Sequence, residues 1–295
     1  MMPSWLFHAL LTVLLFGGWG FVSRKLGDAL TAEQALVISS LGLLPVLAWL
    51  GSRGSSVSTR RGRGIVIAVA AGLLTGFGNL CLYQLLRSGE KAATLVPLTA
   101  LYPLVTVLLA VVLLRERLNL WQGAGIVLAT AAIYFFNVAS ERELSIRSLG
   151  WVLLPLALWG VSALLQKLAT RDLSADASCF WLLLGMVPVA ALVALTSPMP
   201  RRQLSLAVWL SGLGLGLLLG LGNLTLLAAY ASDGKASIIT PLAGLYPIVT
   251  IPLAIVFLGE RVLPREWVGI ALSLVAVAGM SFEGQPPPVA AESRA

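Results

Sequence analysis

Two apolar stretches of the sequence carry the same polar side chains at the same spacing. Asn79 and Tyr102 in the first stretch match Asn223 and Tyr246 in the second, each displaced by 144 positions (223 − 79 = 144). An amide offers donors and an acceptor, and a tyrosine offers a hydroxyl on an aromatic ring, so these residue types suit the binding of a solute. A buried amide is costly unless it is paired. The two asparagines therefore either join neighbouring helices or contact a solute.

Proline adds a second kind of chemistry, because it lacks the N–H that a helix needs. Each stretch carries a pair of prolines, Pro97 and Pro103 in the first and Pro241 and Pro247 in the second. Each proline leaves the carbonyl four residues earlier without its helical partner. In apolar surroundings such carbonyls are tolerated when they are buried in protein or line a cavity. We therefore expect kinked helices along a pathway, with Tyr102 and Tyr246 beside the kinks; a static kink that fills space is the alternative.

Polar positions that differ between the two stretches are better candidates for specificity, since a solute is rarely symmetric. Tyr83 and Gln84 are matched by Leu227 and Ala228, and Thr99 is matched by Ala243. Tryptophans near the start of each half add aromatic surface. The predicted solute-binding residues are Trp19, Asn79, Tyr83, Gln84, Thr99, Tyr102, Trp159, Asn223 and Tyr246.

Charged residues fall mostly at the ends of apolar stretches. Four lysines at such ends, Lys25, Lys91, Lys167 and Lys235, are expected to snorkel to an interface or to gate a cavity mouth. The sequence has neither an H-E-x-x-H nor a G-x-S-x-G motif, and its single histidine is His8. We therefore expect no catalytic residue, metal or cofactor, no enzyme activity, and no proton relay.

The composition of the chain indicates whether these residues are surrounded by water or by lipid. The chain is 58% hydrophobic and 11% charged, with a mean hydropathy of +0.91, whereas a soluble domain is about 25% charged. A membrane helix needs roughly 20 apolar residues. Ten spans are predicted, at residues 5–24, 33–51, 64–86, 92–114, 119–138, 149–166, 177–196, 205–231, 236–258 and 264–282.

The repeat explains how ten spans are organised. Residues 76–117 match residues 220–261 at half of their positions, and a weaker match aligns 15–26 with 157–168, displaced by 142 (157 − 15 = 142). Five spans separate equivalent positions, so the second copy must be inverted. The predicted fold is all-α and integral to the membrane, with ten helices in two inverted five-helix repeats, residues 1–140 and 141–282, before a disordered tail at 283–295. Inverted repeats are typical of secondary transporters.

Small residues recur on one face of the third helix of each repeat. Ala68, Gly72 and Gly76 follow at intervals of four, and Gly212, Gly216 and Gly220 repeat the pattern. This spacing lets helix backbones approach closely in lipid. We expect close packing there, with a sliding seam between moving helices as the alternative.

The full set of motifs resembles the EamA-type transporters of the drug/metabolite transporter superfamily. The residues that carry the resemblance are Trp159-Gly160 with Lys167, the two proline pairs, Leu114-Arg-Glu-Arg117 and Leu258-Gly-Glu-Arg261. The first half departs from the pattern, because Gly17-Gly18 stands where Trp-Gly is usual and the tryptophan is displaced to Trp19. The resemblance implies a central cavity walled by the first, third and fourth helices of each half, fifth helices at the edge, and export or exchange of small metabolites such as amino acids.

The predicted function is therefore a secondary transporter that moves a small organic metabolite by alternating access, with a channel-like facilitator or lipid scramblase as the alternative. Its partners would be the solute and membrane lipids, as a monomer or homodimer. Nucleic acid is not expected, because the net charge of +7 is explained by loops at lipid headgroups. A basic cluster at Arg53, Arg60, Arg61 and Arg63 favours cytoplasmic termini in a bacterial inner (plasma) membrane. Substrate, direction and ion coupling stay open.

Overall fold

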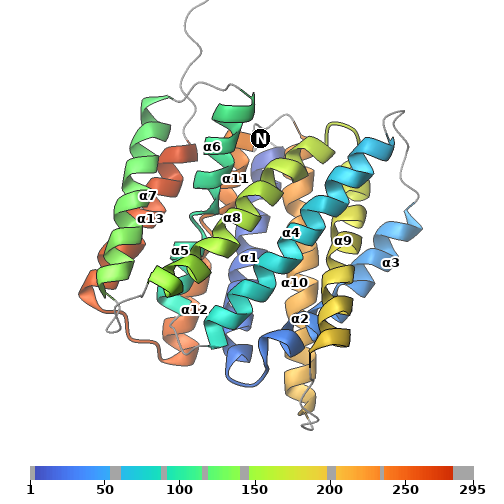
Figure 1. Ribbon diagram of the computed structural model, residues 1–295, viewed down its shortest axis with the longest axis horizontal. Helices are drawn as coiled ribbons and strands as arrows, with labels where there is room; N and C mark the ends of the chain where they lie inside the picture. The colour runs from blue at the N-terminus through green and yellow to red at the C-terminus, as the bar shows by residue number, and fades with distance from the viewer. Residues whose placement is uncertain are drawn as a thin grey trace, which may run out of the picture.

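A computed structural model describes residues 4–53, 61–87, 92–114, 119–139, 146–197, 204–232 and 236–281, and within these ranges the protein is all helical, with no strand (Figure 1). The helices are α1 (Ser4–Gly27), α2 (Ala32–Gly42), α3 (Leu44–Ser52), α4 (Arg61–Arg87), α5 (Ala92–Thr99), α6 (Tyr102–Leu114), α7 (Leu120–Ala139), α8 (Ile146–Ala169), α9 (Ala175–Thr196), α10 (Leu206–Ala231), α11 (Ala236–Ala243), α12 (Pro247–Leu258) and α13 (Pro264–Ser281). The predicted tail at 283–295 lies outside the described residues. The all-α class is confirmed.

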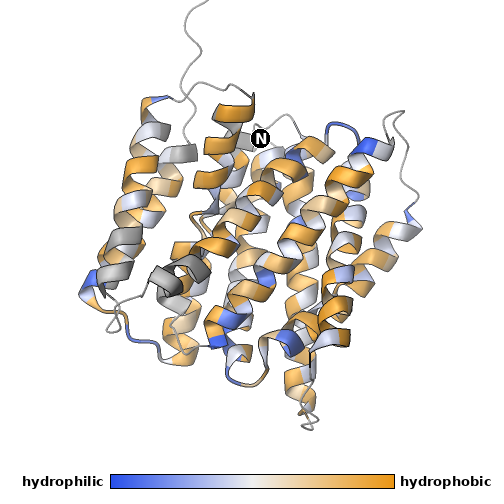
Figure 2. Cartoon of the chain, in the orientation of Figure 1, coloured by the Kyte–Doolittle hydropathy of each residue, from blue (hydrophilic) through white to orange (hydrophobic). Residues whose placement is uncertain are grey.

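Several of these helices have the length and apolar character of membrane spans. Six described segments qualify by length and composition: Ser4–Gly27, Ala32–Ser52, Gly62–Arg87, Ala175–Thr196, Leu206–Ala231 and Ile239–Leu258. Apolar residues dominate the helices in Figure 2, and many large ones point outward, such as Leu195 at 86% exposure and Val256 at 72%. An outer surface of this kind suits lipid and not water.

Central helices pack mainly against helices of the other sequence half. Helix α4 packs on α8 and α9, and α10 packs on α1 and α2. The shorter helices follow the same rule, with α6 on α8 and α12 on α1, while α7 and α13 pack together at one edge (Figure 1). In that view α1 and α4 run downward, whereas α8 and α10 run upward.

Glycines allow the closest of these helix contacts. A Cβ atom at Gly72 of α4 would collide with the carbonyl oxygen of Leu182 in α9, and a Cβ at Gly216 of α10 would collide with the carbonyl oxygen of Ser39 in α2. Only a hydrogen in place of a side chain lets two backbones come this near. The predicted close packing at these glycines is confirmed.

Two spans are interrupted between their paired prolines. Helix α5 ends at Thr99 and α6 begins at Tyr102, while α11 ends at Ala243 and α12 begins at Pro247. Proline suits the first turn of a helix, where its missing N–H is not needed. Tight i to i+3 bonds bridge the breaks, such as Leu104 N–H to Leu101 O at 2.9 Å and Tyr246 N–H to Ala243 O at 3.3 Å. The carbonyl of Ala243 is therefore not free, although proline chemistry alone predicts that it is.

Candidate functional site

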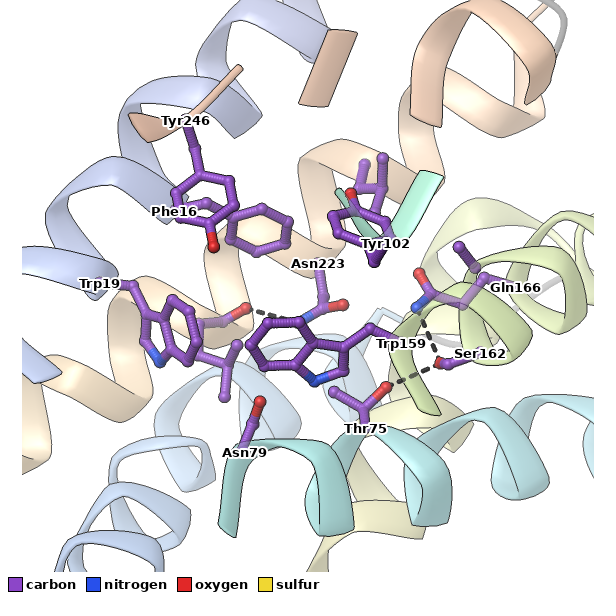
Figure 3. A pocket seen from close by; sticks show the side chains of 13 residues that line it. Phe16, Trp19, Thr75, Asn79, Tyr102, Trp159, Ser162, Gln166, Asn223 and Tyr246 are labelled. Carbon is purple, nitrogen blue, oxygen red and sulfur yellow. Dashed lines mark hydrogen bonds between the residues drawn. The ribbon is translucent and has the colours of Figure 1, made fainter. Parts of the chain in front are cut away.

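A cavity of about 60 Å³ lies at the centre of the helices (Figure 3). One set of lining residues comes from α1, α4 and the α5–α6 break: Phe16, Trp19, Thr75, Asn79 and Tyr102. The other set comes from α8, α10 and the α11–α12 break: Trp159, Ser162, Ala163, Gln166, Leu219, Asn223, Leu226 and Tyr246. These residues fall in the first, third and fourth predicted spans of each half, or in line with them.

Aromatic rings form matching walls on the two sides of the cavity. Tyr102 and Trp159 meet edge to face with ring centroids 6.3 Å apart, and Phe16 and Tyr246 do so at 6.4 Å. Trp19 meets Trp159 edge to face at 5.8 Å. Edge-to-face contacts of this kind are favourable, because the positive edge of one ring points at the negative face of another. The helix breaks place both tyrosines in this arrangement.

A hydrogen-bonded polar cluster forms one wall, where α4 meets α8. Thr75 Oγ1 and Ser162 Oγ are 2.8 Å apart, and Gln166 Nε2 donates to Ser162 Oγ at 3.2 Å. Ser162 Oγ also donates to the backbone carbonyl of Ala71 at 2.9 Å. All three side chains are buried, with Gln166 only 5% exposed. We name Thr75, Ser162 and Gln166 the polar wall; Figure 3 shows its hydrogen bonds.

The two repeated asparagines line the cavity in different ways. Asn223 Nδ2 donates to the carbonyl of Leu219 in its own helix at 2.9 Å. Asn79 Nδ2 is buried and has no hydrogen-bond partner among the described residues. The other unpartnered polar atom of a lining amide is Gln166 Oε1, again with reference to the described part of the chain. The two asparagines are thus equivalent in the sequence but differ in their hydrogen bonding.

Contacts of the first helices correct the register of the weaker repeat. Thr106 Oγ1 donates to Gly160 O and Thr250 Oγ1 donates to Gly17 O, both at 2.9 Å. The threonines are 144 apart (250 − 106 = 144), but the glycines are 143 apart (160 − 17 = 143). The displacement of 142 read from the sequence is therefore wrong by one residue. Phe16 is the spatial counterpart of Trp159, and Arg24, instead of Lys25, is that of Lys167.

Three predicted solute-binding residues lie outside the cavity lining. Tyr83 is buried behind it, with its ring centroid 6.4 Å from that of Trp19. Thr99 is buried in α5 and lies 3.5 Å from the hydroxyl of Tyr246. Gln84 is exposed and donates to Glu33 Oε1 at 2.6 Å. The six others, Trp19, Asn79, Tyr102, Trp159, Asn223 and Tyr246, all line the cavity.

None of the predicted lysines and prolines whose side chains the structure describes lines the cavity. Lys167 Nζ donates to the carbonyl of Tyr230 at 2.7 Å, and Lys25 is exposed. Lys91 and Lys235 lie outside the described residues. Pro103, Pro241 and Pro247 are buried at the helix breaks, and the backbone of Pro97 continues α5. Among described residues the lining contains no charged side chain.

An ion pair joins α1 to the end of α12, away from the cavity. Arg24 Nε lies 3.1 Å from Glu260 Oε1, with side chains 15% and 7% exposed, and Arg24 also contacts Asp28 at 3.0 Å. Partly buried charges of this kind are stable only when paired. The described residues include no group of three or more His, Cys, Asp or Glu side chains that could hold a metal ion.

Sequence reasoning missed the polar wall and Phe16. Thr75 is matched by Leu219 at the displacement of 144, so the rule that pointed to Tyr83 and Gln84 would also have found Thr75. At the displacement of 142, Ser162 is matched by Gly20 (162 − 142 = 20), so the same rule would also have found Ser162. With the displacement of 143, Ser162 corresponds to Trp19 and Gln166 to Ser23 (162 − 19 = 143; 166 − 23 = 143).

Comparisons with known proteins agree with this architecture. A solved structure titled only "Crystal structure of protein" superposes with a TM-score of 0.69 over 95% of this chain and 96% of that chain, at 17% identity, which shows a shared fold. An uncharacterized protein of Methanocaldococcus jannaschii is 28% identical over 131 residues, 44% of this chain and 94% of the relative. A model of the EamA-like transporter family matches residues 3–138 and again 146–282. The chain belongs to the EamA-like transporter family and is an integral membrane protein.

Proposed function

We propose that this transporter moves a small organic metabolite, of the size of an amino acid, through the central cavity by alternating access. The observation that carries the proposal is the composition of the cavity walls. Equivalent elements of both halves contribute to them, and each half places a tyrosine at a helix break. Broken helices around a central site are a recurrent device of secondary transporters, because the break supplies polar groups and a point of flexure.

The proposed framework is ten spans in two inverted five-helix units. Counting α2–α3, α5–α6 and α11–α12 as one interrupted span each reduces the thirteen described helices to ten. Reciprocal packing supports the symmetry, since α4 on α8 mirrors α10 on α1. The opposite directions of α4 and α10 in Figure 1 support the inversion. The archaeal relative, which is about half as long as this chain, supports a single unit as the ancestral form.

Two kinds of contact suit the two roles that alternating access requires. At the glycine contacts between α4 and α9 and between α10 and α2, the two helix backbones touch each other directly. We infer that each of these helix pairs moves as one rigid body. The Arg24–Glu260 pair, by contrast, can open by side-chain rotation and closes one end of the α1–α12 contact. We infer that breaking this pair accompanies opening on that side.

Coupling to protons is not part of the proposal. Proton-driven carriers commonly place a carboxylate or histidine in the path, and among described residues the cavity lining has neither. Facilitated diffusion or exchange is the simpler mechanism for such a lining. We place both termini in the cytoplasm and the protein in a bacterial inner (plasma) membrane.

Counterflow in proteoliposomes tests the proposal. Vesicles loaded with unlabelled metabolites from a panel are diluted into trace labelled solute, and a carrier should show saturable uptake that is stimulated by solute on the opposite side. Flux that rises linearly with concentration and shows no such stimulation would establish a channel. Movement of labelled lipid without solute counterflow would establish a scramblase. Tyr246→Ala is the matched loss-of-function control, since Tyr246 lines the cavity at a helix break.

A further inference from the structure

Two cavity-lining residues, Gln166 and Asn79, each carry a buried amide atom that could form a further hydrogen bond. Gln166 Oε1 can accept a hydrogen bond and Asn79 Nδ2 can donate one, yet neither has a partner among the described residues. Their residues are 5% and 1% exposed. Buried polar atoms in proteins are nearly always paired with protein, water or ligand. In Figure 3 the oxygen of Gln166 points away from Ser162 and toward Tyr102, which also lines the cavity.

The absence of charge restricts the solute further. Within the described ranges no charged side chain lines the cavity, and the charged residue next to Gln166, Lys167, donates to the carbonyl of Tyr230. An ion moved from water into such surroundings has no counter-charge to offset its lost hydration. The face of an aromatic ring could attract a cation. In the pairs of Trp159 with Tyr102 and of Tyr246 with Phe16, however, the edge of one ring already occupies the face of the other. These faces are therefore not offered to a cation.

The cavity is small and therefore favours a compact solute. Its volume of about 60 Å³ has room for several waters, since one water needs roughly 10–15 Å³. A six-membered ring with one short substituent is a solute of this scale. Trp19, Tyr102 and Trp159 offer flat apolar surfaces to such a ring.

We propose that the cavity selects an uncharged, single-ring solute bearing an amide or lactam, whose N–H donates to Gln166 Oε1. The substrate class rests on the proposed transport function. Zwitterionic amino acids do not belong to this class, because both of their charges would lack partners in the lining. The polar wall is then a specificity element as well as a helix contact.

A series of nearly isosteric probes tests the inference on the full-length purified protein. Benzamide is neutral with a donor and an acceptor, acetophenone lacks the donor, and benzoate and benzamidinium carry opposite charges. A ligand stabilises the state that it binds, so each probe's affinity can be read from the shift in melting temperature against concentration. We expect benzamide to bind about tenfold more tightly than acetophenone, the factor for one neutral hydrogen bond. Both ions and zwitterionic phenylalanine should bind more weakly than acetophenone.

Variants locate the effect. Gln166→Leu and Gln166→Met should reduce benzamide affinity about tenfold and leave acetophenone affinity unchanged, so that the preference disappears. Either variant keeps the Ser162–Thr75 and Ser162–Ala71 contacts, which do not involve the glutamine. Gln84→Leu is the matched control, because Gln84 is an exposed glutamine that pairs with Glu33 outside the cavity. It should leave the benzamide preference intact.

Three outcomes would overturn the inference. In the first, an ion or phenylalanine stabilises the protein as much as benzamide does. In the second, benzamide and acetophenone bind with equal affinity. In the third, benzamide does not bind. The transport proposal has a separate readout. Saturable counterflow of a charged metabolite would preserve the transport function while refuting the substrate class, whereas benzamide binding without any counterflow would refute transport alone.

Discussion

The glycine seam between α10 and α2 makes the sharpest prediction about stability. A Cβ added at Gly216 would lie 2.8 Å from Gly42 Cα, besides colliding with the carbonyl of Ser39. Carbon atoms prefer a separation of about 3.5–4.0 Å, so Gly216→Ala must push two backbones apart by about 1 Å. Backbone cannot rotate away as a side chain does. We therefore take the upper end of the overpacking cost, about 3 kcal/mol.

The same helix supplies a matched control for this cost. Gly214→Ala adds the same methyl group where nothing lies within 4 Å. Replacing glycine by alanine inside a helix gains roughly 1 kcal/mol when nothing collides. The net expectation is a loss of about 2 kcal/mol for Gly216→Ala and a gain of about 1 kcal/mol for Gly214→Ala. At about 2 °C per kcal/mol, the melting temperatures should differ by about 6 °C.

The assay is thermal unfolding of both variants in the same detergent, followed by intrinsic fluorescence. Gly72→Ala on α4 should behave as Gly216→Ala does, because its Cβ would collide with the carbonyl of Leu182. A Gly216→Ala protein that melts at or above the temperature of Gly214→Ala would refute the reasoning. The α10–α2 contact would then be looser than its glycines indicate.

Three further predictions concern the cavity and the ion pair. Tyr102→Ala and Tyr246→Ala should lower counterflow at least about tenfold with little loss of monodisperse protein; equal losses of both would indicate a scaffold role. Asn223→Leu removes a hydrogen bond to Leu219 and should cost about 1 kcal/mol, whereas Asn79→Leu removes a buried donor that has no partner among the described residues and should not lower the melting temperature. If both fall equally, Asn79 has a structural partner. Arg24→Gln and Glu260→Gln should show a coupling energy in a double-mutant cycle, since each single change already removes the ion pair that joins them; additive effects would contradict a coupled pair.

Helix content and the positions of the helix breaks could be predicted from residue types alone. Apolar stretches of membrane length require helices, and proline pairs weaken them at fixed points. What the pattern could not give was the form of the break. Residues 244–246 leave the helix between Ala243 and Pro247, and the bond from Tyr246 N–H to Ala243 O satisfies a carbonyl that a simple kink would leave free. Local hydrogen-bond rearrangement of this kind depends on backbone geometry and not on residue type.

Candidate site residues could be predicted where aromatic and amide side chains are repeated. Gln84 shows why a sequence rule based on asymmetry alone fails. It lies five positions after Asn79, which places it about 140° further around the helix, on the face where it meets Glu33 and not the cavity. Tyr83 keeps nearly the same face as Asn79 but lies one turn further on, where Trp19 covers it. A residue lines the cavity only when it lies both on the helix face that points to the cavity and at the same depth along the helix.

Symmetry of backbone and asymmetry of side chains together explain how one cavity could hold an unsymmetric solute. Thr75 of the first half corresponds to Leu219 of the second, and Ser162 of the second half corresponds to Trp19 of the first, although all four line the same hollow. In the proposed mechanism, a twofold scaffold lets the two halves exchange roles as the cavity opens to each side. The polar wall does not exchange, because it is tied to α4 and α8 by the carbonyl of Ala71. The polar end of a solute would therefore stay on the same helices throughout the cycle, and only its exit would change sides.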